Sequence, residues 1–269
     1  MREHKKDIII NGRNIAINYI EPIAGAPTIL WLGGYLSDMF GSKASFLRNL
    51  SLEKDLGCAF FDFSYTGLSQ PLKDEEDLFI NQQPGVSVKK SFLQACLSEW
   101  LEEAYYIYKN FCCQNTIIIG SSCGAWIAML LVQLLHKEAI QAKSMILLAP
   151  APDFTSRLLF NKLTPEQVAY LEKEKYIYIR QEGAEISLPF SKKFIEDAQQ
   201  HLLLDKILDI TAPTYILHGE LDNVVPLSHV MQILNCLPYS DVSFSILPGA
   251  DHSLSRSQDL AKLVQIISL

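Results

Sequence analysis

Short runs of β-branched and aromatic residues alternate along the chain with longer segments in which apolar residues recur every three or four positions. The short runs predict eight strands, at residues 7–10, 14–19, 28–32, 58–63, 116–119, 144–148, 214–217 and 242–247. The longer segments predict helices at residues 43–50, 88–111, 124–136, 228–237 and 259–267. This alternation is typical of an α/β fold, in which helices flank both faces of a mostly parallel sheet. Only a short turn around Gly12 separates the first two strands, which should therefore form an antiparallel hairpin.

The segment from about residue 150 to residue 209 breaks this alternation, because it is longer than an ordinary crossover between two strands. Within it, the sequence Leu-Thr-Pro-Glu-Gln at residues 163–167 has the pattern that opens a helix. We therefore expect one domain, residues 1–269, with a helical cap inserted at approximately residues 150–209 over the carboxyl edge of the sheet.

Composition and charge narrow the classes of partner. The chain has 269 residues, of which 49% are hydrophobic, and this is enough apolar sequence for one large core. Its formal net charge of −7 argues against nucleic-acid binding, which needs clustered Lys and Arg, and favours a small-molecule or acylated substrate. The sequence indicates no particular oligomeric state.

The chain also lacks the patterns of a secreted or membrane protein. Its charged first residues lead into an apolar run too short for a signal peptide, and no apolar segment reaches the length that spans a bilayer. We therefore expect a cytoplasmic protein whose six scattered cysteines are reduced thiols.

A Gly-x-Ser-x-Gly motif with Ser122 at its centre lies between an apolar strand and an apolar helix. This is the context of a nucleophile elbow, a turn so sharp that Gly120 and Gly124 leave no room for a Cβ atom and the serine is strained with its hydroxyl exposed. The motif alone is weak, since an ordinary glycine-rich turn between a strand and a helix has the same letters. In this context, Ser122 is our candidate nucleophile.

A serine hydroxyl needs a histidine to accept its proton and a carboxylate to orient that histidine. Asp222 follows the strand at 214–217 and His252 follows the strand at 242–247, which is the chain order expected after a nucleophile elbow. Because parallel strands end at the same edge of a sheet, these side chains should meet Ser122 there. Taken singly, Asp222 has an alternative role as a turn former and His252 as a surface residue.

Other residues resemble members of this trio. Asp153 follows the strand at 144–148 and is the reserve acid. His218 is expected to make a structural hydrogen bond. The remaining histidines have no matching position and are expected to face solvent: His4, His136, His201 and His229.

The oxyanion that forms on a substrate carbonyl needs two preorganised backbone donors. One should be the N–H of Cys123, directly after the nucleophile. The second candidate is the N–H of Tyr35, because Gly33 and Gly34 before it permit a close approach of the backbone; the alternative is a plain Gly-Gly turn. The Cys123 thiol itself is expected to be a packing group, since the backbone of this position should face the substrate.

Three stretches resemble one family of the α/β-hydrolase superfamily: residues 34–44, 61–69 and 120–124. It is the abhydrolase family of the mitochondrial palmitoyl-protein thioesterase that also hydrolyses acyl glucuronides. The similarity continues through residues 176–204 of the cap and through residues 218–226. The resemblance implies the α/β-hydrolase fold and the following site: Ser122, Asp222 and His252 as nucleophile, acid and base, with the N–H groups of Tyr35 and Cys123 as oxyanion donors.

The chain departs from that family at some positions. Its animal members carry a mitochondrial transit segment, whereas this chain begins almost at its first strand, so we expect a bacterial-type relative. Cys123 and Ala125 replace residues that are common in the elbow, and residues 253–256 after His252 also differ. The acyl preference is therefore not carried over.

These features together predict a serine hydrolase that cleaves a carboxylic ester or acyl thioester through a Ser-linked acyl-enzyme. The mechanism requires no metal or organic cofactor. Phe154, Leu158 and Leu159, early in the cap, are candidates to line an acyl pocket. Two alternatives are a carbon–carbon bond hydrolase or lyase that uses the same three residues, and a non-catalytic ligand-binding protein with this fold.

Overall fold

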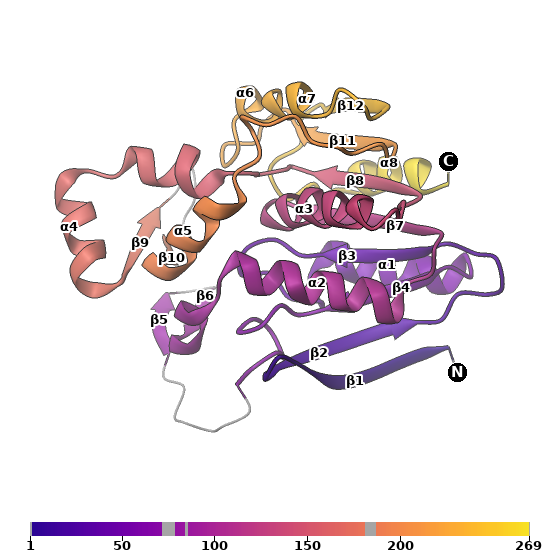
Figure 1. The fold of residues 1–269 in the computed structure, drawn as a ribbon, viewed down its shortest axis with the longest axis horizontal. Helices are drawn as coiled ribbons and strands as arrows, with labels where there is room; N and C mark the ends of the chain where they lie inside the picture. The colour runs from indigo at the N-terminus through magenta and orange to yellow at the C-terminus, as the bar shows by residue number, and fades with distance from the viewer. Residues whose placement is uncertain (1, 72–78, 84–85, 181–186, 269) are drawn as a thin grey trace.

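The computed structural model describes residues 2–71, 79–83, 86–180 and 187–268, and its centre is an eight-stranded sheet (Figure 1). In spatial order the strands are β1 (Glu3–Ile10), β2 (Arg13–Ile20), β4 (Gly57–Phe61), β3 (Thr28–Leu32), β7 (Thr116–Ser121), β8 (Ser144–Leu148), β11 (Thr214–Gly219) and β12 (Val242–Leu247). The β1–β2 and β2–β4 pairs are antiparallel, and the pairs from β4 onward to β12 are parallel. The predicted strands, the first hairpin and the mostly parallel sheet are confirmed.

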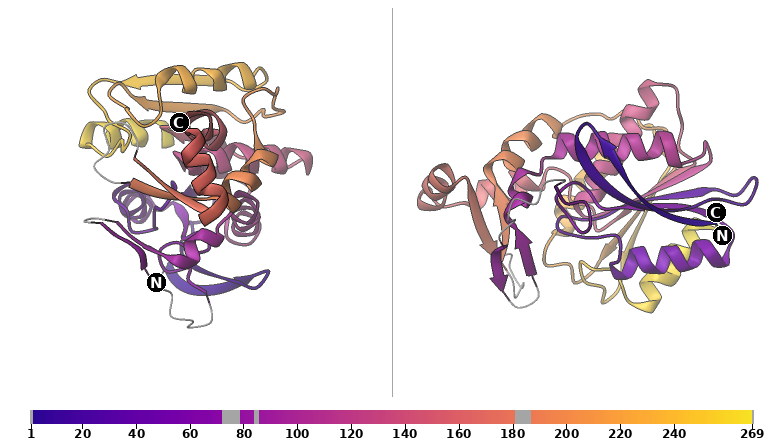
Figure 2. Two further views of the ribbon diagram at one scale, coloured as in Figure 1. Left: turned by 90° about the vertical axis from the view of Figure 1, so that its left-hand side faces the viewer. Right: turned by 90° about the horizontal axis from the view of Figure 1, so that it is seen from below.

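Helices cover both faces of the sheet (Figure 2). One face carries α1 (Ser42–Glu53) and α8 (Ser257–Ile267), and the other carries α2 (Leu97–Phe111), α3 (Cys123–Lys137), α6 (Leu227–Val230) and α7 (Gln232–Cys236). Every residue of β3, β4, β7 and β8 is buried, because both faces of these strands are covered. This is why the central strands read as unbroken apolar runs.

Two predicted helices differ from the structure. Residues 88–111 do not form one helix, since they contain the end of β6 (Val86–Lys89), a 3₁₀ helix η1 (Lys90–Gln94) and then α2. The predicted helix at 228–237 is two short helices, α6 and α7. Strand β6 pairs with β5 (Phe79–Gln83) in a hairpin that the sequence did not predict.

The break before α2 has a long-range cause. Ala95 and Cys96 are extended, and the first N–H groups of α2 therefore need partners outside the helix. The carboxylate of Asp197 accepts from the Ser98 N–H at 2.8 Å and from the Ser98 hydroxyl at 2.7 Å. Because Asp197 is 99 residues away in the sequence, apolar periodicity could not locate this helix start.

The segment between β8 and β11, here called the β8–β11 insertion, lies beyond one end of the sheet strands (Figure 1). Its elements are a π-helical turn η2 (Thr155–Leu159), η3 (Phe160–Lys162), α4 (Pro165–Glu174), the paired strands β9 (Tyr176–Arg180) and β10 (Ser187–Ser191), α5 (Lys192–Ala198) and η4 (Gln199–His201). Thr164 and Gln167 form a reciprocal capping box at the start of α4, where the sequence predicted a helix. The two strands were not predicted, and the division into one domain with a cap stays a prediction.

Asp153 ties the two ends of this insertion together. Its buried carboxylate accepts from the N–H groups of Leu203 and Leu204, each at 2.8 Å, and the side chain of Arg157 lies 3.8 Å away. Its backbone has φ of +56°, which is unusual for a residue with a side chain. Asp153 is therefore occupied in holding the insertion and is not hydrogen-bonded to His252.

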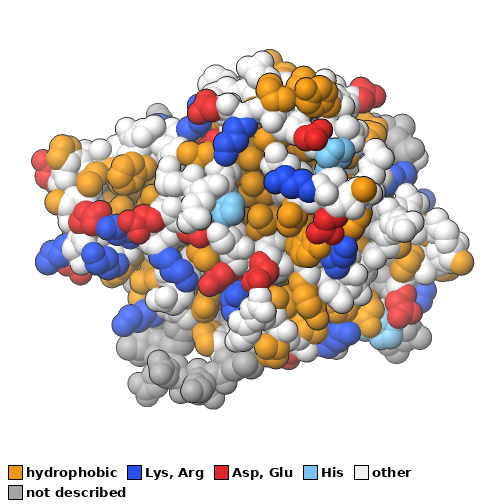
Figure 3. All heavy atoms as spheres, viewed as in Figure 1, with side chains coloured by type: hydrophobic (Ala, Val, Ile, Leu, Met, Phe, Trp, Pro, Cys, Tyr) orange, Lys and Arg blue, Asp and Glu red, His pale blue; other side chains and the backbone are white. Residues whose placement is uncertain are grey.

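Acidic and basic side chains are interspersed on the face shown in Figure 3. The ion pairs include Lys109 with Glu138 and Arg157 with Asp205. Among the helices of the described residues, none has both the length and the apolar character needed to cross a membrane.

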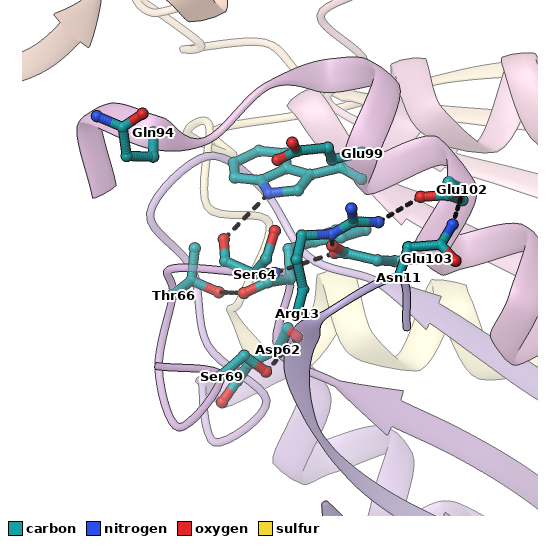
Figure 4. Close-up of polar contacts among 12 residues, drawn as sticks. Asn11, Arg13, Asp62, Ser64, Thr66, Ser69, Gln94, Glu99, Glu102 and Glu103 are labelled. Carbon is teal, nitrogen blue, oxygen red and sulfur yellow. Dashed lines mark hydrogen bonds and ion pairs between the residues drawn. The ribbon is translucent and has the colours of Figure 1, made fainter. Parts of the chain in front are cut away.

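A buried polar cluster supports the loop after β4 (Figure 4). The Glu103 carboxylate, on α2, accepts from Arg13 Nε at 2.6 Å and from the Ser64 N–H at 3.0 Å. Arg13 also pairs with Glu102, which is partly exposed. The neighbouring Asp62 carboxylate accepts from the N–H groups of Met39 and Leu68 and so joins this loop to the loop after β3.

Burial raises the pKa of Glu103 to about 7, although the Ser64 N–H and the Arg13 guanidinium lower it. The folded protein thus binds this proton more tightly than the unfolded chain does. The stabilisation is complete below the ordinary Glu pKa of 4.5 and is lost as pH rises through about 7.

We expect ionisation of Glu103 to lower the free energy of unfolding by on the order of 2 kcal/mol between pH 5 and pH 8, and Glu103→Gln to remove that contribution. Chemical denaturation at the two pH values measures the difference. Glu102→Gln is the matched control, because it changes a more exposed carboxylate on the same guanidinium and should leave the fall unchanged. An equal fall in Glu103→Gln and in the unmodified protein would contradict the assignment.

Candidate active site

The turn from β7 into α3 places Ser122 in a strained backbone conformation, with φ of 55° and ψ of −117°. The turn is tight because backbone atoms crowd both flanking glycines. A Cβ at Gly120 would lie 2.4 Å from the Gly124 carbonyl oxygen, and a Cβ at Gly124 would lie 2.2 Å from the Leu32 carbonyl oxygen. Glycine is therefore required at both positions.

The structure brings Ser122, His252 and Asp222 together in one hydrogen-bonded series. His252 Nε2 lies 3.0 Å from Ser122 Oγ, and His252 Nδ1 lies 2.8 Å from Asp222 Oδ2. The three residues follow β7, β12 and β11, as the sequence predicted for strands that end at one edge. The Asp222 side chain is fully buried, whereas His252 is 24% exposed.

Asp222 is held as a carboxylate. Its Oδ1 accepts from the N–H groups of Val224 and Val225, both at 2.9 Å. Burial opposes its ionisation, but the hydrogen bond and charge of His252, the Val225 N–H and the His218 ring together lower the pKa of Asp222 below its ordinary value. The group is therefore ionised at neutral pH and can orient the His252 ring.

The loop that carries His252 is fastened to the start of α1. The Lys43 ammonium donates to the Ser253 carbonyl, and the hydroxyls of Ser42 and Ser255 are 3.1 Å apart. Burial lowers the pKa of Lys43, while the charge of Asp251 opposes that effect. No pattern in the sequence singled out Lys43, because its role depends on a loop 210 residues away.

Two backbone N–H groups flank Ser122. The loop after β3 approaches so closely that a Cβ at Gly34 would lie 3.4 Å from Ser122 Cβ. The N–H groups of Tyr35 and Cys123 donate to no other residue that the structure describes, and both residues line the cavity in front of Ser122. Backbone N–H groups without a partner at this position can donate hydrogen bonds to an oxyanion.

The Cys123 side chain is buried, and burial raises the pKa of its thiol far above the ordinary value. A thiol held in its neutral form is a poor nucleophile. The buried Cys123 side chain therefore acts as a packing group behind the turn.

The Tyr35 side chain points into the β8–β11 insertion. Its hydroxyl donates to the Pro189 carbonyl at 2.8 Å, and its ring stacks on Phe190 with centroids 4.9 Å apart. Phe154 and Phe194 contact the same ring edge to face. One residue thus joins the loop beside Ser122 to strand β10.

A cavity of about 600 Å³ opens in front of Ser122. Phe154, Leu158 and Leu159 line it together with Phe190, and so do other apolar residues that the sequence did not single out: Leu163, Ile179, Leu188, Val224 and Val225. In contrast, Phe160 and Tyr170 are exposed at the surface. The described lining contains Lys43, Lys162 and Arg180 and no carboxylate.

Three histidines differ from the sequence expectations. His229 does not face solvent, since it is buried with Nε2 2.7 Å from the Pro152 carbonyl oxygen. His201 is half-buried, and its Nε2 lies 2.6 Å from the Ser98 hydroxyl. His218 is buried, but neither of its ring nitrogens makes the structural hydrogen bond predicted for it with any described residue.

No protein-family model matches the chain. A solved structure of a putative hydrolase from Agrobacterium vitis S4 is 31% identical in sequence, with a TM-score of 0.84 and a match that covers 98% of both chains. The mitochondrial palmitoyl-protein thioesterase ABHD10 of Rattus norvegicus is 26% identical over 247 residues, which are 88% of this chain and 73% of the rat protein. The α/β hydrolase domain-containing protein 10 from mouse is 21% identical, with a TM-score of 0.79 over 98% of this chain and 97% of that one.

These comparisons confirm the resemblance that the sequence motifs indicated. The mostly parallel sheet with helices on both faces is the fold that the resemblance implied. The similarity to these proteins extends over most or all of this chain. The chain belongs to the α/β-hydrolase superfamily.

Proposed function

We propose that this protein is a serine hydrolase that cleaves a carboxylic ester or an acyl thioester through an acyl-enzyme. The observation that carries the proposal is the hydrogen-bonded series from Asp222 through His252 to Ser122, which ends at the cavity. A buried carboxylate, an oriented imidazole and a strained, accessible serine supply the groups that acyl transfer needs.

In this mechanism, His252 Nε2 accepts the Ser122 proton as Oγ attacks the acyl carbonyl carbon. The N–H groups of Tyr35 and Cys123 stabilise the resulting oxyanion. The tetrahedral intermediate then collapses, and the His252 imidazolium donates its proton to the leaving alcohol or thiol. A water molecule that gives its proton to His252 then attacks the acyl-enzyme, and the acid leaves as the His252 imidazolium returns a proton to Ser122 Oγ. Asp222 stabilises the imidazolium in both halves of the reaction.

The cavity supports a substrate with an apolar acyl group and an anionic leaving group. Its apolar lining suits an acyl chain, and relatives from rat and human are named palmitoyl-protein thioesterases. The ammonium groups of Lys43 and Lys162 beside the cavity favour an anion, such as the carboxylate of the acyl glucuronides that the family resemblance implies. Both substrate types therefore belong in the first activity panel.

The unpaired donors beside Ser122 favour hydrolysis over a purely binding role, because a binding protein has no need for them. A carbon–carbon bond hydrolase or lyase that uses the same three residues is the second candidate, and diketone substrates separate it from an esterase. The cytoplasmic location stays a prediction, since the rat and human relatives are named as mitochondrial proteins.

The first prediction from the proposed function tests the nucleophile. Ser122→Ala should abolish hydrolysis and labelling by a fluorophosphonate probe, because it removes the attacking oxygen and creates no large cavity. The panel contains p-nitrophenyl esters and acyl thioesters of graded chain length, together with neutral and glucuronide esters of one acid. Cys123→Ala is the matched control and should keep substantial activity, since its backbone N–H remains. A loss as large as that of Ser122→Ala would instead indicate a thiol mechanism.

The second prediction tests the acid. Asp222→Asn should lower kcat by about 10³- to 10⁴-fold, because the neutral amide favours the wrong tautomer of His252 and no longer stabilises the imidazolium. Asp153→Asn should lower thermal stability but affect kcat much less, since its carboxylate binds the Leu203 and Leu204 N–H groups. Steady-state kinetics of both folded variants ranks them, and the reverse ranking would transfer the acid role to Asp153.

The third prediction tests the acyl pocket. Leu158 is partly exposed and lines the cavity, so Leu158→Ala should shift the ratio of kcat/KM values between short and long acyl chains, with one methylene equivalent to about 1–3 kcal/mol. Phe160→Ala, two residues further along, changes an exposed side chain outside the cavity and should leave that ratio unchanged. If the two variants gave the same chain-length profile, the acyl chain would bind elsewhere.

A further inference from the structure

His218 lies near the end of β11 beside the proposed acid. Its side chain is 1% exposed, and neither ring nitrogen has a hydrogen-bond partner among the residues that the structure describes. A buried polar group without a partner costs about 1–3 kcal/mol, so its presence needs a physical reason. The charged atom nearest to its Nδ1 is Asp222 Oδ2, at 3.6 Å.

The two oxygens of Asp222 are unequally filled. Oδ1 accepts two backbone hydrogen bonds, from Val224 and Val225, whereas Oδ2 accepts one, from His252 Nδ1. A carboxylate oxygen has room for a second donor. His218 Nδ1 is placed to supply it after a movement of less than 1 Å, and catalytic hydrogen bonds are often long before substrate binds.

We propose that His218 is a positioning residue, a neutral imidazole whose Nδ1–H closes onto Asp222 Oδ2 and holds the carboxylate against His252 during acyl transfer. The inference rests on the proposed function, because it assigns a second donor to the acid of that mechanism. His218 does not touch the substrate and acts through Asp222.

Burial favours the neutral form of the His218 ring, which carries one N–H. Burial lowers the pKa of His218. The Asp222 charge raises this pKa, the His252 charge lowers it and the Val225 backbone raises it. His229, on α6, is a further imidazole whose charge interacts with that of His218, and burial also lowers its pKa. A neutral donor can stabilise Asp222 without competing with the imidazolium that forms on His252.

An apolar residue at position 218 should have different effects on the stability of the fold and on kcat. Replacing an unpartnered buried imidazole by an apolar group of similar volume removes an unsatisfied polar group, so the fold should not suffer. The acid would lose its second donor at the step where charge develops on His252. A role confined to packing would give the opposite result, a loss of stability with little effect on kcat.

The experiment compares His218→Leu with His218→Asn in the full chain, with a p-nitrophenyl ester as substrate. His218→Leu should lower kcat roughly tenfold, the factor for one hydrogen bond to a charged group, with KM within about twofold and an unchanged or higher melting temperature. His218→Asn places an amide N–H near the position of Nδ1 and should recover kcat to within about threefold of the unmodified protein. If His218→Leu does not fold, His218→Ala against His218→Asn carries the same contrast.

Two controls make the result specific. His229→Leu also removes a buried imidazole, but that ring contacts Pro152 and not Asp222, so kcat should stay close to that of the unmodified protein. In an Asp222→Asn background, His218→Leu should cause no further loss, because both changes act through the same carboxylate.

Three outcomes would overturn the proposal: unchanged kcat in His218→Leu, equal losses in His218→Leu and His218→Asn, or full additivity with Asp222→Asn. An unmodified protein that neither hydrolyses the panel nor reacts with the fluorophosphonate probe would overturn the proposed function as well. Failure of the His218 proposal alone and failure of the proposed function therefore give different results.

Discussion

The close contact between the β7–α3 turn and the end of β3 is the constraint on which the rest of the site depends. The carbonyl groups of Leu32 and Gly33 press against Gly124, and the Gly124 carbonyl presses against Gly120. This contact turns the Ser122 hydroxyl toward the cavity and brings Gly34 and Tyr35 alongside it. A single methyl group at either glycine would force Ser122 and the candidate oxyanion donors apart.

Buried carboxylates hold the loops around this contact. Asp62 joins the loops after β3 and β4, Asp153 joins the two ends of the β8–β11 insertion, and Asp222 shapes the loop after β11. Each accepts two or more backbone N–H groups, so each replaces regular hydrogen bonding where a strand has ended. The loops at this edge lack regular secondary structure, and these hydrogen bonds to carboxylates hold them in place.

Much of this arrangement could be predicted because it follows from local pattern and one rule of sheets. Apolar runs marked the central strands, and parallel strands that end at one edge brought Ser122, Asp222 and His252 together. The features that were missed depend on contacts between distant residues. Asp197 sets the start of α2 from 99 positions away, Lys43 reaches Ser253 across 210, and strand β10 pairs with β9 inside a segment expected to be helical.

Tyr35 has a consequence for the evolution of this protein. Its backbone belongs to the loop beside Ser122, whereas its hydroxyl and ring contact Pro189 and Phe190 of the insertion. The insertion that borders the cavity and the loop that approaches Ser122 therefore share one side chain. An insertion transferred from a relative should therefore fit this protein only if the residue at position 35 changes with it. We expect sequence changes in the insertion to be accompanied by changes in the loop after β3.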